Sequence, residues 1–90
     1  MTKYTVSFTK IFDREFDKLS KIDQKRVMKT LSLLKNSPFY PSLRTKKMEG
    51  GDDTMESRVN RDMRIIWQFD EDDGNIIVAL DVGHHDVLKG

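Results

Sequence analysis

The fold of this chain is decided by the stretch MESRVNRDMRIIWQF, residues 55–69, in which apolar and polar side chains alternate. The apolar positions of its second half are Met63, Ile65, Trp67 and Phe69. Alternation of this kind is typical of a strand with one buried face. The acidic run at residues 70–73 leads into Gly74-Asn75, which predicts a hairpin loop and a return strand over residues 75–82. Residues 55–82 are therefore expected to form a small antiparallel sheet, with Trp67 in its core.

The chain before this sheet predicts one further strand and two helices. Residues 3–8 alternate like a strand, and Thr9 is placed to cap a helix whose apolar face is Phe12, Phe16 and Leu19. Ser20 opens a capping-box sequence, so a second helix starts near it, with an apolar face of Val27, Leu31 and Leu34. Pro38 ends this helix. We expect an α+β fold of order β-α-α-β-β-β, in which a two-helix hairpin packs on a four-stranded, antiparallel-type sheet.

Length and composition bound the class of protein. Ninety residues form one compact unit with a modest core, so a single domain is expected over residues 1–90. The absence of cysteine excludes disulfides and thiol catalysis. No apolar run approaches 18 residues, and we therefore expect neither a secretory signal nor a membrane span, and a cytoplasmic protein.

Charge is distributed unevenly along the chain, although the formal net charge is only +1. Residues 1–47 contain 12 Lys and Arg against 4 Asp and Glu, whereas residues 48–90 contain 4 against 11. Two regions of opposite sign are expected on the folded domain. The basic region is explained equally well by lysines that solvate amphipathic helices and by a surface that binds a polyanion.

An ordered set of short motifs resembles the RelE/ParE superfamily of small bacterial and archaeal toxins. The motifs are Arg58 in one strand, the strand opening Met63-Arg64-Ile65-Ile66, an acidic hairpin, residues 77–80, and the closing Gly83-His84-His85-Asp86-Val87-Leu88. The resemblance implies the toxin of a type II toxin–antitoxin system, a metal-independent endoribonuclease that cleaves mRNA on the ribosome and inhibits translation. It also implies a cognate antitoxin protein as partner, and no cofactor.

Arg58 and Arg64 are the first candidates for the chemistry. Both are expected on the polar face of neighbouring strands, where two guanidinium groups can hold a phosphate through bidentate hydrogen bonds. The resemblance places a phosphate-binding arginine at Arg64. The competing interpretation is ordinary cross-strand pairing with Glu56 or Asp81. From such a position, truncation of Arg64 to alanine is expected to change the free energy of unfolding by about 1 kcal/mol or less.

Two histidines follow the last strand. A histidine titrates near neutral pH and can donate a proton to a leaving oxygen. The resemblance implies this catalytic role for His84, with His85 as the second candidate, whereas two exposed histidines in a C-terminal tail are the alternative. A metal site of His84, His85 and Asp86 is disfavoured, because adjacent histidines rarely face one ion and no other histidine or cysteine completes it.

A basic segment before the sheet supplies the candidate base. The resemblance implies a lysine or a glutamate in this region, which here is Lys46 or Glu49. A lysine acts as a base only when its pKa falls, and neighbouring cations favour this. A plain basic loop against RNA backbone is an equally supported alternative. Contacts with the nucleic-acid backbone are expected from Arg44, Lys47, Arg61, Lys25 and Lys29.

Several positions depart from the family pattern. The closing aromatic residue is replaced by Leu88. Met55 or Glu56 stands where tryptophan is common, and Met63 stands where tyrosine is common. The site is therefore poorly equipped for base stacking. Two alternatives follow. One is a ParE-like toxin that inhibits DNA gyrase without cutting nucleic acid, which the shared fold allows. The other is a degenerate member that only binds an antitoxin.

Overall fold

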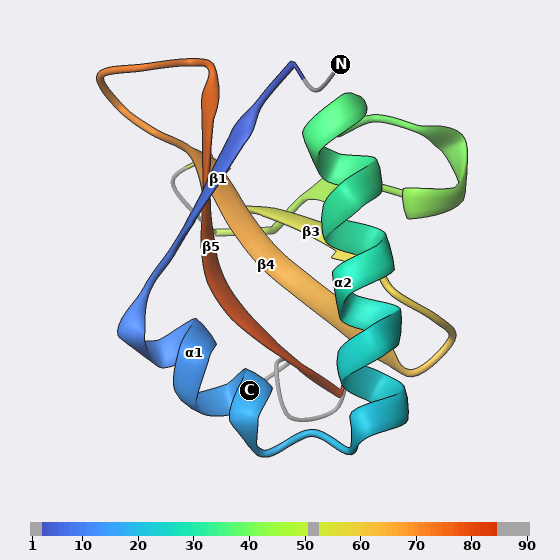
Figure 1. Ribbon diagram of the computed structural model, residues 1–90. Helices are drawn as coiled ribbons and strands as arrows, with labels where there is room; N and C mark the ends of the chain where they lie inside the picture. The colour runs from blue at the N-terminus through green and yellow to red at the C-terminus, as the bar shows by residue number, and fades with distance from the viewer. Residues whose placement is uncertain (1–2, 51–52, 85–90) are drawn as a thin grey trace.

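The computed structural model describes residues 3–50 and 53–84. Along the chain its elements are β1 (Thr5–Phe8), α1 (Lys10–Asp17), α2 (Lys21–Asn36), the 3-10 helix η1 (Pro41–Leu43), β2 (Lys46–Lys47), β3 (Met55–Arg58), β4 (Met63–Phe69) and β5 (Ile76–His84). Both α-helices lie on one side of a single twisted sheet, with α1 near the end of β5 (Figure 1). The α+β class and the order of the expected elements are confirmed.

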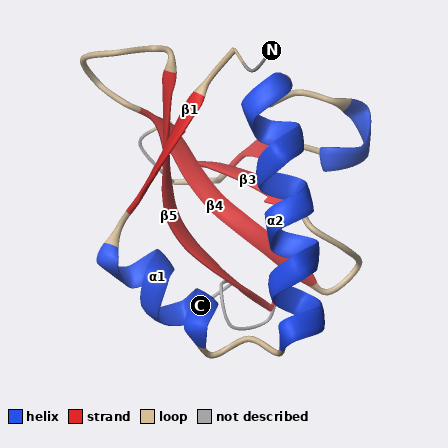
Figure 2. Ribbon diagram, viewed as in Figure 1, coloured by secondary structure: helices blue, strands red, loops and turns tan. Residues whose placement is uncertain are grey.

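The sheet has the strand order β1-β5-β4-β3-β2. Figure 2 labels β1, β5, β4 and β3 of this sheet. β1 pairs with β5 in parallel, and the other neighbours are antiparallel. The expected four-stranded, antiparallel-type sheet therefore needs two corrections. It has a fifth strand, β2, which is too short to carry a periodic pattern, and one parallel pair. Side chains alternate in the same way in parallel and antiparallel strands, so the sequence pattern does not fix the direction of β1.

The last strand is longer than the sequence predicts. The sequence predicts a strand over residues 75–82, whereas β5 runs through Gly83 to His84. Its final residues pair with the start of β4, Gly83 with Arg64 and His84 with Met63. The partner strand therefore supplies the hydrogen-bonding neighbours that hold this glycine in extended conformation.

A β-bulge interrupts the pairing of β4 with β5. Ile66 pairs with Asp81 but Trp67 pairs with Ala79, which leaves Leu80 as an extra residue. The residues of β5 that face the helices consequently change phase at the bulge. Those buried on this face are Ile77, Ala79 and Val82.

Both helices begin at the capping residues that the sequence predicts. Thr9 Oγ1 accepts a hydrogen bond from the Phe12 N–H (3.1 Å) and donates one to the Leu80 carbonyl (3.0 Å), so the cap also ties α1 to β5. Ser20 Oγ accepts from the Asp23 N–H at 3.1 Å. Among the helices of the described chain, none has both the length and the apolar character needed to cross a membrane.

The core lies between the helices and the sheet. Its buried members include Val6, Phe12, Val27, Leu31, Leu34, Leu43, Met63, Ile65, Ile77 and Val82. Trp67 is fully buried among them, which confirms the expectation for this residue. Its indole Nε1 donates to Ser57 Oγ (2.8 Å), and Ser57 Oγ shares a 2.6 Å hydrogen bond with Thr45 Oγ1. The indole N–H therefore has the partner that a buried tryptophan needs.

Candidate active site

Two rows of paired residues cross the sheet on the face turned away from the helices. One row, read from β2 to β5, is Lys46, Glu56, Ile66 and Asp81, and the next, read from β3 to β5, is Arg58, Arg64 and Gly83. Directly opposite residues of neighbouring strands share a face. The alternate positions, Ser57, Ile65 and Trp67, are buried on the helix side. The open face of the sheet therefore gathers three of the predicted catalytic residues, Lys46, Arg58 and Arg64.

Glu56 connects the two rows. Its Oε1 lies 3.6 Å from Lys46 Nζ and 4.0 Å from Arg64 Nε. The side chains of Glu56 and Arg64 are only 12% and 16% exposed, so their attraction is screened less than that of a surface pair. Of the two carboxylates expected as partners for the arginines, Glu56 makes the contact. Asp81 forms no ion pair within the described part of the chain.

Arg64 also holds the turn between β3 and β4. Its Nη1 donates towards three backbone carbonyls, those of Asn60 (2.8 Å), Met63 (3.1 Å) and Arg61 (3.2 Å). A charged donor buried against carbonyls contributes more to stability than a free surface arginine. These contacts lead us to expect a larger effect of Arg64 on folding than its place on the polar face suggests. Its Nη2 donates none of the hydrogen bonds that the structure describes, and this part of the fork is the one available to a ligand.

Arg58 approaches the same turn from the neighbouring strand. Its Nε donates to the Asn60 carbonyl at 3.4 Å, a long contact, so both guanidinium groups converge on one oxygen. Asn60 shapes the turn from within, because its Oδ1 accepts from the N–H groups of Asp62 (2.9 Å) and Met63 (3.0 Å). The turn is thus fixed by side chains at both ends, and it positions the two arginines relative to each other.

His84 stands apart from this cluster. It is the exposed last residue of β5 and lies opposite Met63, whose side chain is buried on the helix side. Arg64 lies opposite Gly83 instead. Successive side chains of a strand point to opposite faces, so His84 and Arg64 leave the sheet on different sides. The structure does not bring the predicted acid onto the row of the predicted phosphate binders. His85 lies outside the described residues.

The remaining predicted residues are spread around the sheet edge and α2. Lys47 pairs with Asp53 at 3.1 Å and both side chains are exposed. Arg44 follows η1 in the left-handed conformation (φ 46°). The other candidates, all exposed, are Glu49, Arg61, Lys25 and Lys29. The sequence predicts Glu56 only as an alternative ion-pair partner of the arginines. It does not predict a role for Arg26. This residue follows Asp23 by three positions, and the two side chains pair at 3.4 Å.

The fold changes the titration of Asp81, which lies at the β5 end of the first row. Burial raises the pKa of its carboxyl above the usual value of 3.8, while a hydrogen bond from the Val82 N–H lowers it in part. Charges at the C-terminal end of α1 act more weakly, since Glu15 raises and Lys18, the residue after the helix, lowers the same pKa. The open face therefore carries a carboxyl group that is less acidic than an exposed aspartate.

Metal ligands are not assembled among residues 3–50 and 53–84, where no group of three or more His, Cys, Asp or Glu side chains is arranged to hold an ion. The disfavoured site of His84, His85 and Asp86 falls mostly outside these residues.

Comparison with known proteins identifies the class of fold. No protein-family model matches the sequence, and a search of curated proteins finds no match. Solved structures do match, and the fold is that of the RelE/ParE toxin superfamily, as the sequence resemblance predicts.

Three of these structures illustrate the likeness. The archaeal RelE–RelB complex from Pyrococcus horikoshii OT3 matches with a TM-score of 0.74 and 22% identity, over 91% of this chain and 94% of that chain. The toxin–antitoxin complex RelBE2 from Mycobacterium tuberculosis gives 0.75 and 24%, over 92% and 99%. A metal-bound toxin from Helicobacter pylori gives 0.76 and 25%, over 98% and 99%. Since one fold hosts different activities, the function depends on the residues of the site.

Proposed function

We propose that this chain is the toxin of a type II toxin–antitoxin system, and that it inhibits translation in the cytoplasm by cleaving mRNA on the ribosome. The observation that carries the proposal is the cluster on the open face, where Glu56 Oε1 lies within 4.0 Å of both Lys46 Nζ and Arg64 Nε, with Arg58 opposite Arg64. The chain has the same fold as its matches in the RelE–RelB complexes. This likeness supports a toxin of that class.

The chemistry follows from the groups in the cluster. A base removes the proton of a ribose 2′-hydroxyl, and the oxygen attacks the adjacent phosphorus. The bond to the 5′-oxygen of the next nucleotide breaks, which leaves a cyclic phosphate, and an acid protonates the departing oxygen. Lys46 is the base, with Glu49 as the second candidate. His84 is the acid that the resemblance implies, although in this structure it leaves the sheet on the side away from Arg64. Arg64 and Arg58 stabilise the charge that develops on the attacked phosphate.

Glu56 serves this reaction as a positioning residue. Its carboxylate lies between Lys46 Nζ and the Arg64 guanidinium and is itself largely buried. Arg64 Nη1 is committed to the turn carbonyls. Held at two sides, the arginine presents a fixed donor to the phosphate, and preorganised donors are the ones that stabilise transition states well.

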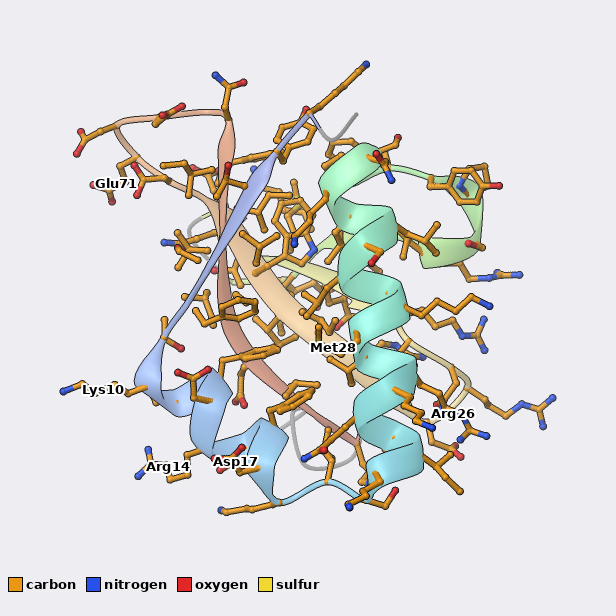
Figure 3. The ribbon with its side chains drawn as sticks, in the orientation of Figure 1. Lys10, Arg14, Asp17, Arg26, Met28 and Glu71 are labelled. Carbon is orange, nitrogen blue, oxygen red and sulfur yellow. The ribbon has the colours of Figure 1, made fainter. Side chains whose placement is uncertain are left out.

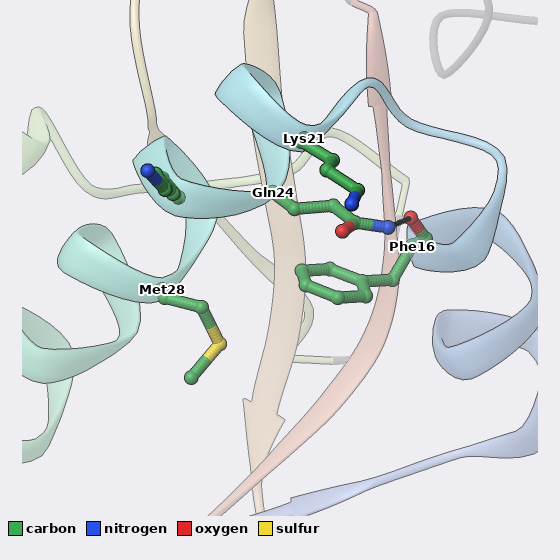
Figure 4. A pocket seen from close by; sticks show the side chains of 5 residues that line it. Phe16, Lys21, Gln24 and Met28 are labelled. Carbon is green, nitrogen blue, oxygen red and sulfur yellow. Dashed lines mark hydrogen bonds between the residues drawn. The ribbon is translucent and has the colours of Figure 1, made fainter.

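An antitoxin has a suitable surface between α1 and α2. An open hollow of about 490 Å³ is lined by Phe16, Lys21, Gln24, Lys25 and Met28 (Figure 4), and the Gln24 side chain donates to the Phe16 carbonyl at 3.0 Å. A second hollow of about 210 Å³ shares Phe16 and Met28 and continues to Phe8. An antitoxin segment with apolar and acidic residues fits both, because its apolar side chains cover Phe8 and Met28 while its acids meet Lys21 and Lys25.

The main alternative is a ParE-like toxin that inhibits DNA gyrase. It needs no phosphate-binding arginine and no acid–base pair, whereas the nuclease needs both. Induction of the chain in a bacterium, followed by incorporation of labelled leucine and thymidine, separates the two. The nuclease predicts that leucine incorporation falls first. If thymidine incorporation falls while leucine incorporation continues, the gyrase function is correct and the nuclease is not.

A further inference from the structure

A basic groove lies on the helix side of the molecule, between α2, η1 and the turn that joins β3 to β4. It has a volume of about 290 Å³. We propose that this groove, called here the α2–turn groove, binds the phosphodiester backbone of RNA as a second anchor that adjoins the open-face cluster at Arg58. The choice of RNA as the polyanion rests on the proposed function.

The lining of the α2–turn groove has the composition of a phosphate site. Three cationic residues line it, namely Arg26, Lys29 and Arg58. Three neutral residues that can form hydrogen bonds lie among them, Thr30, Ser42 and Asn60, and apolar contact comes from Leu33, Leu43 and Val59. No acidic residue occurs among the described residues of this lining. Arginine, lysine, serine, threonine and asparagine are the usual partners of nucleic-acid phosphates.

The cations of the groove are available for a ligand. Arg26 pairs with Asp23 at 3.4 Å, but its side chain is more than half exposed, and such a surface pair contributes little. Lys29 and Arg58 take part in none of the ion pairs of the described chain. Arg26 projects from α2 towards the side of the molecule where the β3–β4 turn lies (Figure 3). A polyanion in the groove therefore meets positive charge from both walls.

The opposite flank of α2 has a different character. There Lys21 and Lys25 stand at the rim of the hollow formed with Phe16 and Met28, which is mainly apolar and suits a protein. The same helix thus carries two pairs of cations in different settings. The sequence predicts backbone contacts from Lys25 and Lys29 alike, whereas the structure separates them, and the groove assigns the RNA contact to Lys29.

The α2–turn groove and the open-face cluster share Arg58, and they also meet at the turn that contains Asn60. Asn60 lines the groove, and its carbonyl accepts hydrogen bonds from both Arg64 and Arg58. An RNA strand held in the groove therefore reaches the turn that positions Arg64. The groove would fix the register of the strand, while the open face would carry out the cleavage.

Binding of an uncleavable RNA tests the groove without depending on cleavage. The probe is a fluorescent single strand with 2′-O-methyl riboses, titrated with the full chain at several salt concentrations. The double variant Arg26→Ala/Lys29→Ala removes two groove cations, and Lys21→Ala/Lys25→Ala removes two from the other flank of the same helix. Each phosphate contact adds about 0.7 to the slope of log K against log salt for single strands, so the groove variant should lose about 1.4. The control variant should keep the wild-type slope and affinity.

A second pair of variants tests the location through repulsion. Ser42→Glu places a carboxylate in the groove, and Ser32→Glu places one on an exposed position of α2 outside the groove lining. Only Ser42→Glu should weaken binding of the probe, while circular dichroism shows both variants folded. The groove is refuted if both double variants weaken binding equally, if neither does, or if the wild-type chain binds no probe at low salt. Displacement of the probe by a polyglutamate peptide as readily as by RNA would likewise reject RNA as the ligand.

The proposed function fails in a distinguishable way. If the chain binds the probe through the groove but does not affect translation, the groove proposal stands and the proposed nuclease function is refuted. If the chain cleaves mRNA but its groove variants bind the probe as the wild type does, the proposed nuclease function stands and the groove proposal is refuted.

Discussion

At the scale of single residues, Arg64 holds the β3–β4 turn in addition to the phosphate-binding role proposed for it. Strand periodicity predicts its position on the polar face, and the resemblance predicts phosphate binding. Neither predicts that Nη1 donates towards the carbonyls of residues 60, 61 and 63, because these contacts depend on the path of the turn. A phosphate binder that also holds its own turn is rigid, which favours binding of a transition state.

Replacement of Arg64 by alanine should therefore affect both folding and toxicity. Hydrogen bonds from a charged group contribute about 1.5–3 kcal/mol, and urea denaturation should show a loss of stability in this range. Toxicity should disappear, since loss of one preorganised donor slows the chemical step about 100- to 1,000-fold. Arg64→Lys should restore the fold better than the activity, because a point charge cannot replace the planar fork.

Arg61→Ala is the matched control, since the Arg61 side chain is exposed on the same turn. Its stability should stay within about 0.5 kcal/mol of wild type. An Arg64→Ala protein as stable as this control would show that the turn contacts contribute nothing. A folded Arg64→Ala protein that stays toxic would disprove the phosphate-binding role.

Asp81 gives the protein a predictable response to pH. Burial disfavours its carboxylate, so the pKa is higher in the folded than in the unfolded chain. The ionised group therefore lowers stability at neutral pH, and this penalty disappears as the pH falls through the folded pKa towards 3.8 and below. Asp81→Asn keeps an oxygen for the Val82 N–H and should be more stable than wild type at pH 7.

Denaturation of Asp81→Asn at pH 7 and at pH 3, compared with wild type, measures this effect. The difference should vanish at the lower pH. Asp62→Asn, on the exposed turn, controls for a general change of net charge. A variant less stable than wild type at pH 7 would mean that the Asp81 carboxylate stabilises the fold.

At the scale of elements, the sequence predicts what local chemistry determines. Thr9 and Ser20 mark the helix starts, and alternation marks β3, β4 and β5, since caps and side-chain period act within a few residues. β2 has only two residues and exists because β3 offers Glu56 and Met55 as partners. The sequence also does not predict on which face of the sheet His84 lies. The extra residue Leu80 shifts the alternation of side chains in β5 before the strand reaches His84. Such features depend on pairing with a distant segment.

Trp67 links several elements through buried hydrogen bonds. Its indole donates to Ser57 in β3, and Ser57 bonds to Thr45 before β2. Trp67→Ala should lower the free energy of unfolding by about 3–5 kcal/mol, the usual range for a large buried aromatic. Chemical denaturation followed by circular dichroism measures this loss.

Phe39→Ala is a suitable comparison. The Phe39 ring packs edge-on against the Trp67 ring, with 6.4 Å between the ring centroids, but Phe39 is 57% exposed. It should destabilise the protein much less. A Trp67→Ala chain that keeps its melting temperature and loses RNA affinity would instead make Trp67 a stacking platform.

At the scale of the whole molecule, the helices and the sheet supply different surfaces. The basic first half supplies α2, whose flanks face the α2–turn groove and the apolar hollow. The second half supplies the sheet that carries Arg58, Arg64 and Glu56. Charge counts predict that opposite signs separate, but they do not predict grooves, which form where elements distant in sequence meet. The fold can be predicted because the residues of the helices and longer strands show the hydrophobic period of their own element. For the site, the sequence predicts which strands carry the candidate residues, but not the contacts between their side chains.

Cleavage of a translated message is the central claim, and primer extension on one reporter mRNA tests it most directly. The reporter is expressed with and without its start codon after induction of the wild-type chain or Arg64→Ala. New 5′ ends should appear inside the coding region with the wild-type chain, disappear when the start codon is removed, and be absent with Arg64→Ala. Growth arrest by the wild-type chain without new 5′ ends in the translated message would contradict the proposed function.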